Sequence, residues 1–315
     1  MTSTKTAGSK SKSQVIKVAN APCSWGVLEF NLPGQGAAYA KVLDEISDTG
    51  YVGTELGDWG FMPTQPELLR EELGKRKLEL VGAFVPVAFC HEEAYADGKK
   101  RALQTARLMA AAVGTSPFIV LADDNGKDAT RTKFAGRISE GQSLSAEQWK
   151  GYGERVTGIA LEVKKETGLR SVFHHHCAGF VETPGEIEAL LQNTDSAVVG
   201  LCFDTGHYRF GGGVDPVEWL QKHRNRIWHM HFKDCNPLVH RQSRDQEWNY
   251  FRSLEHGIFC ELGRGDVPFA AVLAALVHTE YSGWIVVEQD ILPGMGAPRE
   301  YAASNRDFLR QCGLE

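Results

Sequence analysis

Short β-rich runs alternate with amphipathic helical stretches along almost the whole chain, and this alternation constrains the fold more than any other feature. Eight β-rich runs occur, and each is followed by a helical pattern. Parallel neighbours in a sheet need a crossover connection, usually a helix, so strict alternation predicts parallel pairing. Eight such units predict a closed (β/α)8 barrel. The expected strands are 15–22, 51–57, 79–87, 116–123, 170–176, 197–204, 226–234 and 283–289. The expected helices lie near 36–49, 65–76, 92–113, 145–168, 184–193, 215–224, 267–280 and 297–312.

An open, doubly wound sheet is the competing arrangement. It would carry a GxGxxG-type turn after its first strand, and residues 20–30 (NAPCSWGVLEF) contain none. Residues at the expected helix ends agree with the alternation. Pro184 and Pro216 suit the first turn of a helix, and Gly50 and Gly168 suit helix ends. We therefore expect the closed barrel.

The chain is expected to form one domain rather than two. Its 315 residues would allow two domains of roughly 150 residues each, but a barrel of this kind routinely uses 250 or more as one. We assign residues 15–315 to the barrel. Residues 1–14 contain three lysines and no acid, lack the apolar segment of a signal peptide, and are expected to be a disordered tail. The longest gap, 235–265, follows the seventh strand and is expected to cover the barrel mouth.

Charge and cysteine content exclude several classes of function. Without the tail, 31 basic residues face 40 acidic ones, a net charge of −9. A body this acidic is a poor nucleic-acid binder, and no apolar run reaches the ~18 residues of a membrane span. The seven scattered cysteines include no CxxC pair, which fits a reducing cytoplasm. We expect a cytoplasmic protein that acts on a small molecule.

Charged and imidazole side chains collect at the carboxyl ends of five expected strands. In a barrel all these ends face one side, where active sites lie. Charges brought together there cost desolvation energy unless they are paired or bind a metal. Carboxylates and neutral imidazoles together suit a divalent cation. The residues concerned are Glu55, His174–His176, Asp204, His207, His229, His231, Lys233, Asp234, Glu288 and Asp290.

Strand parity selects among these side chains, because alternate residues of a strand share one face. If Asp204 points into the barrel, so does Cys202, while Phe203 faces the helices. The same rule turns His175 toward the helix layer. The other inward positions are then His174, His176, His229, His231 and Glu288.

Each of these residues also has a purely structural interpretation. A single histidine at a strand end is usually a satisfied hydrogen-bonding group, Glu55 alone could form a salt bridge, and Lys233 with Asp234 could form an ion pair. The convergence of four strand ends favours a shared metal site over these separate explanations.

Three segments, FDTGH (203–207), HMHFKD (229–234) and GWIVVEQD (283–290), resemble the sugar phosphate isomerase/epimerase-like superfamily of TIM barrels. This superfamily includes xylose isomerase-like and endonuclease IV-like proteins, and the resemblance spans residues 15–312. Within it the chain looks most like the inosose dehydratases, which act on 2-keto-myo-inositol. The segments that carry this narrower likeness are PCSWGV (22–27), GTELGDWGFMPT (53–64), FHHHCAGFVETP (173–184), FCELGRGD (259–266) and VVEQD (286–290).

The resemblance implies metal ligands at four strand ends. Asp204, His231 and Glu288 match three of them. The fourth is a glutamate in the isomerases and epimerases, but here the strand reads His174–His176. We assign His174, in agreement with parity; the alternatives are a neighbouring histidine or a water. Two carboxylates and two neutral histidines leave a 2+ ion less neutralised, hence a stronger Lewis acid. Mn²⁺ or Co²⁺ is expected first, with Zn²⁺, Fe²⁺ and Mg²⁺ as alternatives.

The implied reaction is loss of water from a cyclic polyhydroxy ketone through an enolate. A base removes the proton next to the carbonyl, the metal holds the developing charge, and an acid protonates the departing hydroxyl. His176 is our candidate base or acid, with Glu55 as its partner or a hydroxyl anchor. His207 and Lys233 are expected to contact substrate oxygens.

Further side chains are candidates for substrate binding. Aromatic rings near the first strand ends are either core or a wall for a sugar-like ring, and Phe30 belongs with them. The residues assigned to substrate binding are Trp25, Trp59, His229, Glu261 and Arg264. A homodimer or higher homo-oligomer is possible for barrels of this kind.

Other functions compete with this interpretation. A sugar or hydroxypyruvate isomerase, or an epimerase, is disfavoured by the missing glutamate of the fifth strand. A lyase acting on 3-keto-glycosides uses the same chemistry and stays open. A DNA-repair endonuclease is disfavoured by the acidic body and by the absence of the extra histidines of a trinuclear zinc cluster. A non-catalytic sugar-binding protein is the least favoured.

Overall fold

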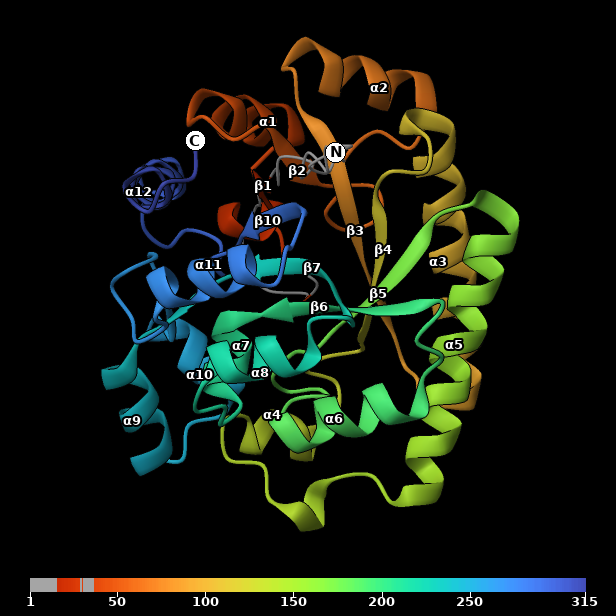
Figure 1. Ribbon diagram of the computed structural model, residues 1–315, viewed down its shortest axis with the longest axis vertical. Helices are drawn as coiled ribbons and strands as arrows, with labels where there is room; N and C mark the ends of the chain where they lie inside the picture. Colours follow the sequence, from red (N-terminus) through yellow and green to blue (C-terminus); the bar gives the residue numbers. More distant parts are fainter. Residues whose placement is uncertain (1–15, 29, 31–36) are drawn as a thin grey trace, which may run out of the picture.

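Eight parallel strands close into a barrel in the computed structural model, which describes residues 16–28, 30 and 37–315 (Figure 1). The strand order is β1-β10-β7-β6-β5-β4-β3-β2, and β1 closes the ring by pairing with both β2 and β10. The predicted single (β/α)8 TIM barrel is therefore confirmed. The strands are β1 (Ile16–Asn20), β2 (Gly53–Glu55), β3 (Glu79–Val87), β4 (Phe118–Asp123), β5 (Arg170–His174), β6 (Val199–Asp204), β7 (Ile227–Phe232) and β10 (Gly283–Val287).

The eight expected helices are all present around the barrel. They are α1 (Tyr39–Asp48), α2 (Pro66–Lys75), α3 (Glu92–Val113), α5 (Ala146–Thr167), α6 (Pro184–Asn193), α8 (Pro216–His223), α11 (Phe269–His278) and α12 (Pro298–Gln311). Short helices that the sequence did not reveal lie in the connections. They are α4 (Ala129–Phe134), α7 (Thr205–Phe210), α9 (Pro237–Asp245), α10 (Tyr250–Glu255) and the 3-10 turns η1 (Pro22–Trp25) and η2 (Glu140–Gln142).

Local capping explains where several helices begin and end. The Thr183 side chain accepts from the backbone N–H of Glu186 at the start of α6, and Pro184 fills the first turn. Asp215 caps α8 in the same way. Gly168 ends α5 with φ of 76°, a left-handed conformation that costs a glycine little. These predicted boundaries are confirmed.

Apolar side chains fill both the space around the barrel and its lumen. Phe203 and Leu201 belong to the large core between strands and helices. Cys202, Val172 and Phe118 pack together in a separate cluster inside the barrel. The parity argument for β6 is therefore confirmed, and the strand presents Asp204 at the inner, carboxyl end of this apolar lumen.

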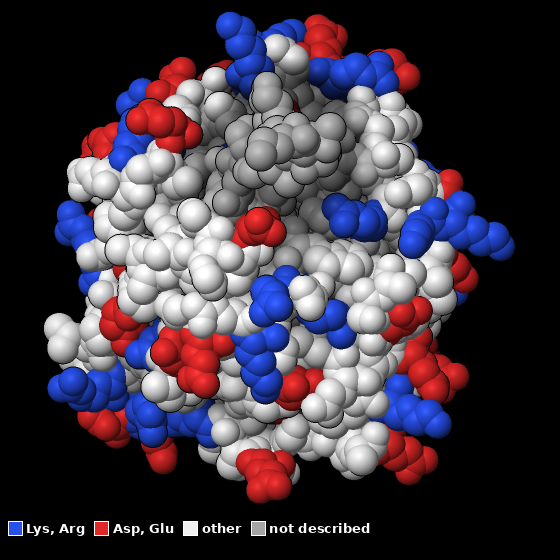
Figure 2. All heavy atoms as spheres, viewed as in Figure 1, with Lys and Arg blue, Asp and Glu red and all other residues white. Residues whose placement is uncertain are grey.

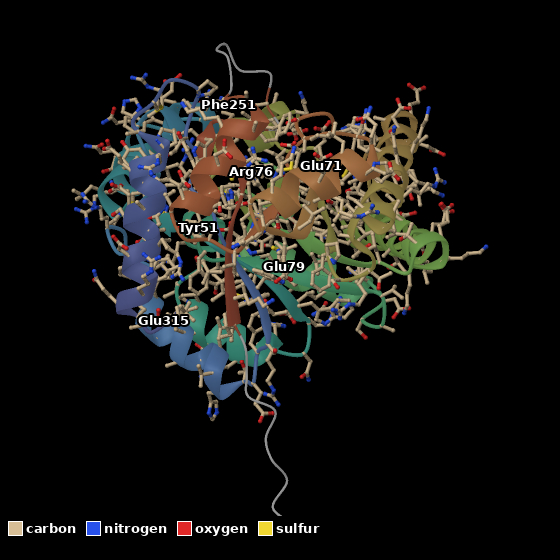
Figure 3. All side chains as sticks on the ribbon, turned by 90° about the horizontal axis from the view of Figure 1, so that it is seen from above. Tyr51, Glu71, Arg76, Glu79, Phe251 and Glu315 are labelled. Carbon is tan, nitrogen blue, oxygen red and sulfur yellow. The ribbon has the colours of Figure 1, made fainter. Side chains whose placement is uncertain are left out.

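The long connection after β7, predicted to cover the barrel mouth, is folded and reaches the mouth through Tyr250, which contacts His176 and Asp290. Strand β8 (Asp234–Cys235) pairs antiparallel with β9 (Phe259–Cys260), and α9 and α10 lie between them. The Asp234 carboxylate accepts from four backbone N–H groups of this region, those of Cys235, Gly263, Gly265 and Val267. Asp234 thus organises the loop rather than pairing with Lys233. Phe251 of α10 lies near one end of the molecule in Figure 3, and Glu315 lies toward the other.

The surface carries both signs of charge. On the face shown in Figure 2, lysines and arginines are interspersed with acidic residues rather than gathered into one basic field. Within the described ranges no helix is long and apolar enough to cross a membrane. No disulfide bond joins any of the seven cysteines, all of which lie within the described ranges. The tail predicted for 1–14 lies outside the described residues.

Candidate active site

A pocket opens at the carboxyl ends of the barrel strands, where the sequence placed the site. It combines carboxylates, histidines and an ammonium group with a few apolar side chains. Its lining residues are Ala21, Pro22, Cys23, Val27, Glu55, Gly57, Asp58, Phe84, His174, His176, Lys233, Glu288 and Asp290.

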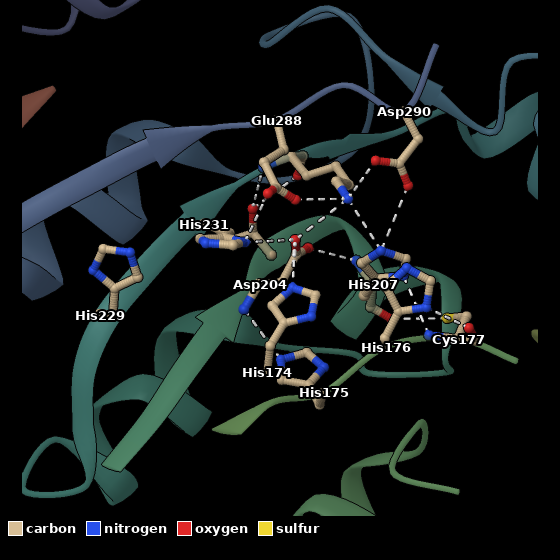
Figure 4. A network of polar contacts seen from close by, with 12 residues as sticks. His174, His175, His176, Cys177, Asp204, His207, His229, His231, Glu288 and Asp290 are labelled. Carbon is tan, nitrogen blue, oxygen red and sulfur yellow. Dashed lines mark hydrogen bonds and ion pairs between the residues drawn. The ribbon is translucent and has the colours of Figure 1, made fainter. Parts of the chain in front are cut away.

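Four of the predicted metal ligands meet beside this pocket and form what we call the ligand cluster: His174, Asp204, His231 and Glu288 (Figure 4). One ligand atom from each lies within 4.8 Å of the others, and all four residues are buried. His174 Nε2 lies 3.4 Å from Asp204 Oδ2, and His231 Nδ1 lies 3.2 Å from Glu288 Oε1. The four residues come from β5, β6, β7 and the end of β10.

Sheet register brings these side chains together. Asp204 is the register partner of His231 on the adjacent strand, so both side chains emerge at the same height on the inner face. The backbone N–H of Glu288 donates to Phe232 O, which extends the pairing of β10 with β7 by one residue. Asp204 also caps α7, because its Oδ1 accepts from the backbone N–H of His207. One carboxylate oxygen is thus held by the helix and the other faces His174.

The cluster has the donor set and charge that a divalent cation requires. His231 Nδ1 has no hydrogen-bond partner among the described residues, yet it lies 3.2 Å from Glu288 Oε1 and 4.0 Å from Asp204 Oδ2. A buried nitrogen facing two carboxylates needs a positive charge on it or between them. Two nitrogens and two carboxylates suit Mn²⁺, Co²⁺, Fe²⁺ or Zn²⁺. The residues present therefore fit a metal.

Lys233 forms the charged wall between the ligand cluster and the rest of the pocket. Its side chain is 1% exposed, and Nζ lies 2.9 Å from Asp290 Oδ1, 3.0 Å from Glu288 Oε2 and 3.7 Å from Asp204 Oδ2. Burial alone would lower the pKa of Lys233, but these three carboxylates outweigh it and hold that pKa well above its usual value. Lys233 therefore carries an ammonium charge at neutral pH.

The ammonium in turn keeps a neighbouring carboxylate ionised. Burial alone would raise the pKa of Asp204, but the Lys233 ammonium and the hydrogen-bonding contact with His174 lower it to about 2.

Two histidines lie side by side, with their rings tilted by 38°, on the other side of Lys233. The ring centroids of His176 and His207 are 3.8 Å apart, and His207 Nε2 lies 3.1 Å from Lys233 Nζ. Burial lowers the pKa of both rings well below the usual histidine value, so both are neutral at neutral pH. His176 directs Nδ1 to the carbonyl oxygen of Cys177. This leaves the Nε2 lone pair as the basic atom of His176.

Glu55 lies at the end of β2 and holds two rings of β7 at once. Its Oε1 is 2.9 Å from His229 Nε2 and 3.1 Å from His231 Nε2. Burial alone would raise the pKa of Glu55, but the two histidines lower it to about 2. His175 points the other way, as parity predicted. It lies against Phe203 and its Nε2 accepts from the backbone N–H of Asp204.

The five side chains assigned to substrate binding do not line the pocket. Trp25 is buried in the core and donates from Nε1 to Glu45 Oε2. Trp59 packs against the same core. His229 is fully buried behind Glu55 and stands apart from the network in Figure 4. Glu261 lines a different depression. The Arg264 side chain is 69% exposed and lies 3.6 Å from Glu261.

Two polar residues of the site were missed at the sequence level. Asp290 pairs with Lys233, and its position after β10 was noted without a role. Tyr250 comes from α10, and its hydroxyl lies 3.4 Å from His176 Nε2 and 3.5 Å from Asp290 Oδ2. Phe30, one of the aromatic residues read as either core or a wall, packs edge-on against Tyr250 and does not line the pocket. The length of the loop after β7 was the only signal for Tyr250.

Curated relatives match nearly the whole chain. Inosose dehydratase of Geobacillus kaustophilus is 29% identical over 300 residues, covering 93% of this chain and 94% of the relative. Rhizopine catabolism protein MocC of Rhizobium meliloti is 32% identical over 295 residues, covering 93% and 87%. Inosose dehydratase of Salmonella agona is 31% identical over 295 residues, covering 93% and 95%.

Solved structures share the fold at lower identity. An L-ribulose 3-epimerase superposes with a TM-score of 0.68 at 15% identity, covering 95% of this chain and 94% of the epimerase. The IOLI protein with a bound zinc atom superposes with a TM-score of 0.66 at 15% identity, covering 94% and 97%. The model of the xylose isomerase-like TIM barrel family matches residues 33–312. With a closed barrel, a buried ligand cluster at its mouth and this match over most of its length, the chain belongs to the xylose isomerase-like TIM barrel family.

Proposed function

We propose that this protein is a metal-dependent hydro-lyase that removes water from a cyclic polyhydroxy ketone of the 2-keto-myo-inositol type. The observation that carries the proposal is the buried ligand cluster with a neutral His176 and a charged Lys233 beside it. The relatives named inosose dehydratase, at 29% and 31% identity, support the choice of substrate. The lack of disulfides among the described cysteines supports a reducing, cytoplasmic location.

His174, Asp204, His231 and Glu288 would hold the divalent cation, with Mn²⁺ or Co²⁺ as the first choices and Zn²⁺, Fe²⁺ or Mg²⁺ as alternatives. When bound, the ion supplies Lewis-acid stabilisation of negative charge on substrate oxygens. His174 occupies the place where isomerases and epimerases of the family carry a glutamate. Without that carboxylate the ligand set keeps more of the ion's charge available to the substrate.

Side chains of the protein move the proton and hold the oxygens. His176 Nε2 takes the proton from the carbon next to the carbonyl. The C–O bond of the β-hydroxyl then breaks, a C=C bond forms, and the hydroxyl leaves as water with a proton returned from the imidazolium. Lys233 and His207 contact the oxygens on which negative charge develops, which is typically the largest contribution to catalysis. Proton transfer of this kind contributes about 10²–10⁴-fold.

An epimerase or isomerase is the alternative on the same scaffold. The solved epimerases share only 14–16% identity, which speaks for the fold alone. The family resemblance implies that isomerases and epimerases use a strand-five glutamate as an acid or base; this chain carries His174 at that place, which favours elimination. Cleavage of 3-keto-glycosides needs the same removal of an α-proton, so the test below includes 3-keto-glucosides as alternative substrates.

The test is incubation of Mn²⁺- or Co²⁺-loaded protein with 2-keto-myo-inositol while the absorbance of the dehydrated dione is followed. His176→Ala should keep metal binding and lower turnover at least 100-fold, because it removes the base. His223→Ala, on the outer helix α8 beside Glu188, is the control and should retain turnover. Near-normal turnover by His176→Ala would contradict the assigned role. Turnover of 3-keto-glucosides instead of the inosose would move the assignment to a glycoside lyase.

A further inference from the structure

The Glu55 carboxylate contacts His231, which belongs to the ligand cluster, and also His229, which does not. Its Oε1 lies between His229 Nε2 and His231 Nε2 at 2.9 and 3.1 Å, and all three side chains are 3% exposed or less. These are hydrogen-bond distances. A carboxylate oxygen only accepts, so each ring directs an Nε2–H toward it.

The hydrogen bond to Glu55 also determines where the other ring nitrogen of His231, Nδ1, points. With Nε2 directed to Glu55, Nδ1 faces Glu288 Oε1 at 3.2 Å and Asp204 Oδ2 at 4.0 Å. Those two carboxylates belong to the ligand cluster. The ring therefore stands between an acceptor on one side and the metal position on the other, which is the arrangement that commonly orients metal-binding histidines.

We propose that Glu55 is a positioning residue that fixes the ring of His231, so that Nδ1 is presented to the metal and Nε2–H is retained by the protein. His229 donates a hydrogen bond to the same carboxylate from the other side and so helps to hold Oε1 in position. The proposal rests on the metal-dependent function above. It replaces the expectation that Glu55 acts directly as an acid, base or hydroxyl anchor.

The surrounding backbone is shaped for this carboxylate. The pairing of β2 with β3 is irregular between Thr54 and Glu55, where Glu55 pairs with Gly82 after a skipped residue. Such irregularities re-aim side chains near active sites. A Cβ at Gly82 would lie 2.7 Å from Glu55 Oε1, too close for any residue but glycine without a shift. The position of Glu55 thus depends on both strands.

A second cation between Glu55, His229 and His231 is the competing explanation, since these three groups also lie within ligand distance of one another. The 2.9 and 3.1 Å separations are already those of direct hydrogen bonds. Glu55 Oε1 already contacts both rings directly, and His231 offers its other nitrogen, Nδ1, to the ligand cluster. We therefore assign the direct contacts and use metal stoichiometry to test the choice.

The experiment compares Co²⁺ binding by calorimetry and visible absorption in five full-length proteins: wild type, Glu55→Ala, Glu55→Gln, Gly82→Ala and the control Glu72→Ala. Glu55→Ala should weaken Co²⁺ binding 10- to 100-fold, the usual effect of losing such a partner. Glu55→Gln keeps one acceptor oxygen and should restore part of the affinity. Gly82→Ala should weaken binding without touching any ligand. Glu72→Ala, which removes a buried carboxylate on α2 outside the pocket, should bind Co²⁺ like wild type.

A second readout needs neither metal nor substrate. In metal-free, ¹⁵N-histidine-labelled protein, the ring N–H groups held by Glu55 should give slowly exchanging, downfield proton signals that disappear in Glu55→Ala and not in Glu72→Ala. Unchanged Co²⁺ affinity in a folded Glu55→Ala protein, or two Co²⁺ ions bound per chain in wild type, would overturn the proposal. Wild type that binds no Co²⁺ but keeps the proton signals would overturn the metal-dependent function while the Glu55 contacts stand.

Discussion

Gly206 lies where the first turn of α7 passes the stem of Lys233. A Cβ at this position would lie 2.6 Å from Lys233 Cγ and 2.8 Å from Lys233 Cβ, closer than real side chains approach. Thr205 adds a hydrogen bond from its hydroxyl to the carbonyl oxygen of Lys233. Gly206 therefore leaves room for the side chain of Lys233, whose ammonium group lies between the ligand cluster and the pair His176 and His207.

Gly206→Ala should consequently displace Lys233. We expect a loss of about 1–3 kcal/mol of stability from overpacking and at least a tenfold loss of dehydratase turnover. Gly185→Ala on α6 is the matched control, since a Cβ there meets no atom within 4 Å among the described residues. Thermal unfolding and turnover of the metal-loaded proteins measure both effects. Equal turnover in the two variants would show that Lys233 does not depend on this close approach.

Residues whose position follows from strand periodicity could be predicted, and those positioned by tertiary contact could not. Asp204 and His231 are inward by parity, and the register of adjacent strands then brings them together. The pairing of Lys233 with Asp290 depends on how the end of β10 bends after the barrel closes. Glu55 was recognised as a site residue, but its contact with His229 spans 174 positions and leaves no local pattern.

At the scale of elements, the loop between β5 and α6 carries His176 and is fastened by a buried carboxylate. Glu182 accepts from the backbone N–H of Ala178 at 2.8 Å and from that of Gly136 at 2.7 Å. Burial raises the pKa of Glu182 to about 7, although Arg131 opposes the shift. Because the folded-state pKa exceeds the unfolded value of 4.5, the stabilisation linked to this proton is complete below about pH 4.5 and is lost as pH rises through about 7.

Glu182→Gln should remove this pH dependence. The amide offers one acceptor where the carboxyl oxygens serve two donors, so the variant loses a hydrogen bond at every pH. Relative to the variant, however, wild type should lose on the order of 3 kcal/mol of unfolding free energy between pH 4.5 and pH 8. Urea unfolding of the metal-free proteins at both pH values measures the difference. A gap between the two proteins that stays constant with pH would contradict the shifted pKa of Glu182.

Short length explains why three of the four missed helices escaped the sequence pattern; α9, with nine residues, was also missed although α8 has only eight. The eight barrel helices have 8 to 22 residues, and their apolar periodicity extends over at least two turns. Helices α4, α7 and α10 have six residues each, too few for a repeating pattern. Tyr250 lies on one of these, which is why the loop was foreseen as a cover but the residue that reaches the site was not.

At the scale of the whole molecule, part of the chain's excess of acidic residues lies at the barrel mouth. Asp204, Glu288, Asp290 and Glu55 are buried together at the barrel mouth against the single ammonium of Lys233. Such a group of charges makes the fold itself sensitive to a cation.

Metal removal should therefore lower the melting temperature. A ligand at 100 times its dissociation constant stabilises a folded protein by about 2.7 kcal/mol, which for a chain of this size corresponds to roughly 4 °C. We expect this difference between Mn²⁺-loaded and chelator-treated protein in thermal denaturation. Asp204→Asn should show little or no metal-dependent shift. A shift of the same size in Asp204→Asn would place the stabilising ion elsewhere.

The apolar cluster formed by Cys202, Val172 and Phe118 inside the barrel also limits the routes by which small molecules can reach the site. Because these side chains pack the lumen beneath the ligand cluster, the substrate of the proposed reaction would enter, and both products would leave, through the mouth where Tyr250 contacts His176. The organic product of the proposed reaction would leave by the path of the incoming ketone, past Lys233. Shared access of this kind makes product a competitor of substrate, so that progress curves should bend early in proportion to the dione released.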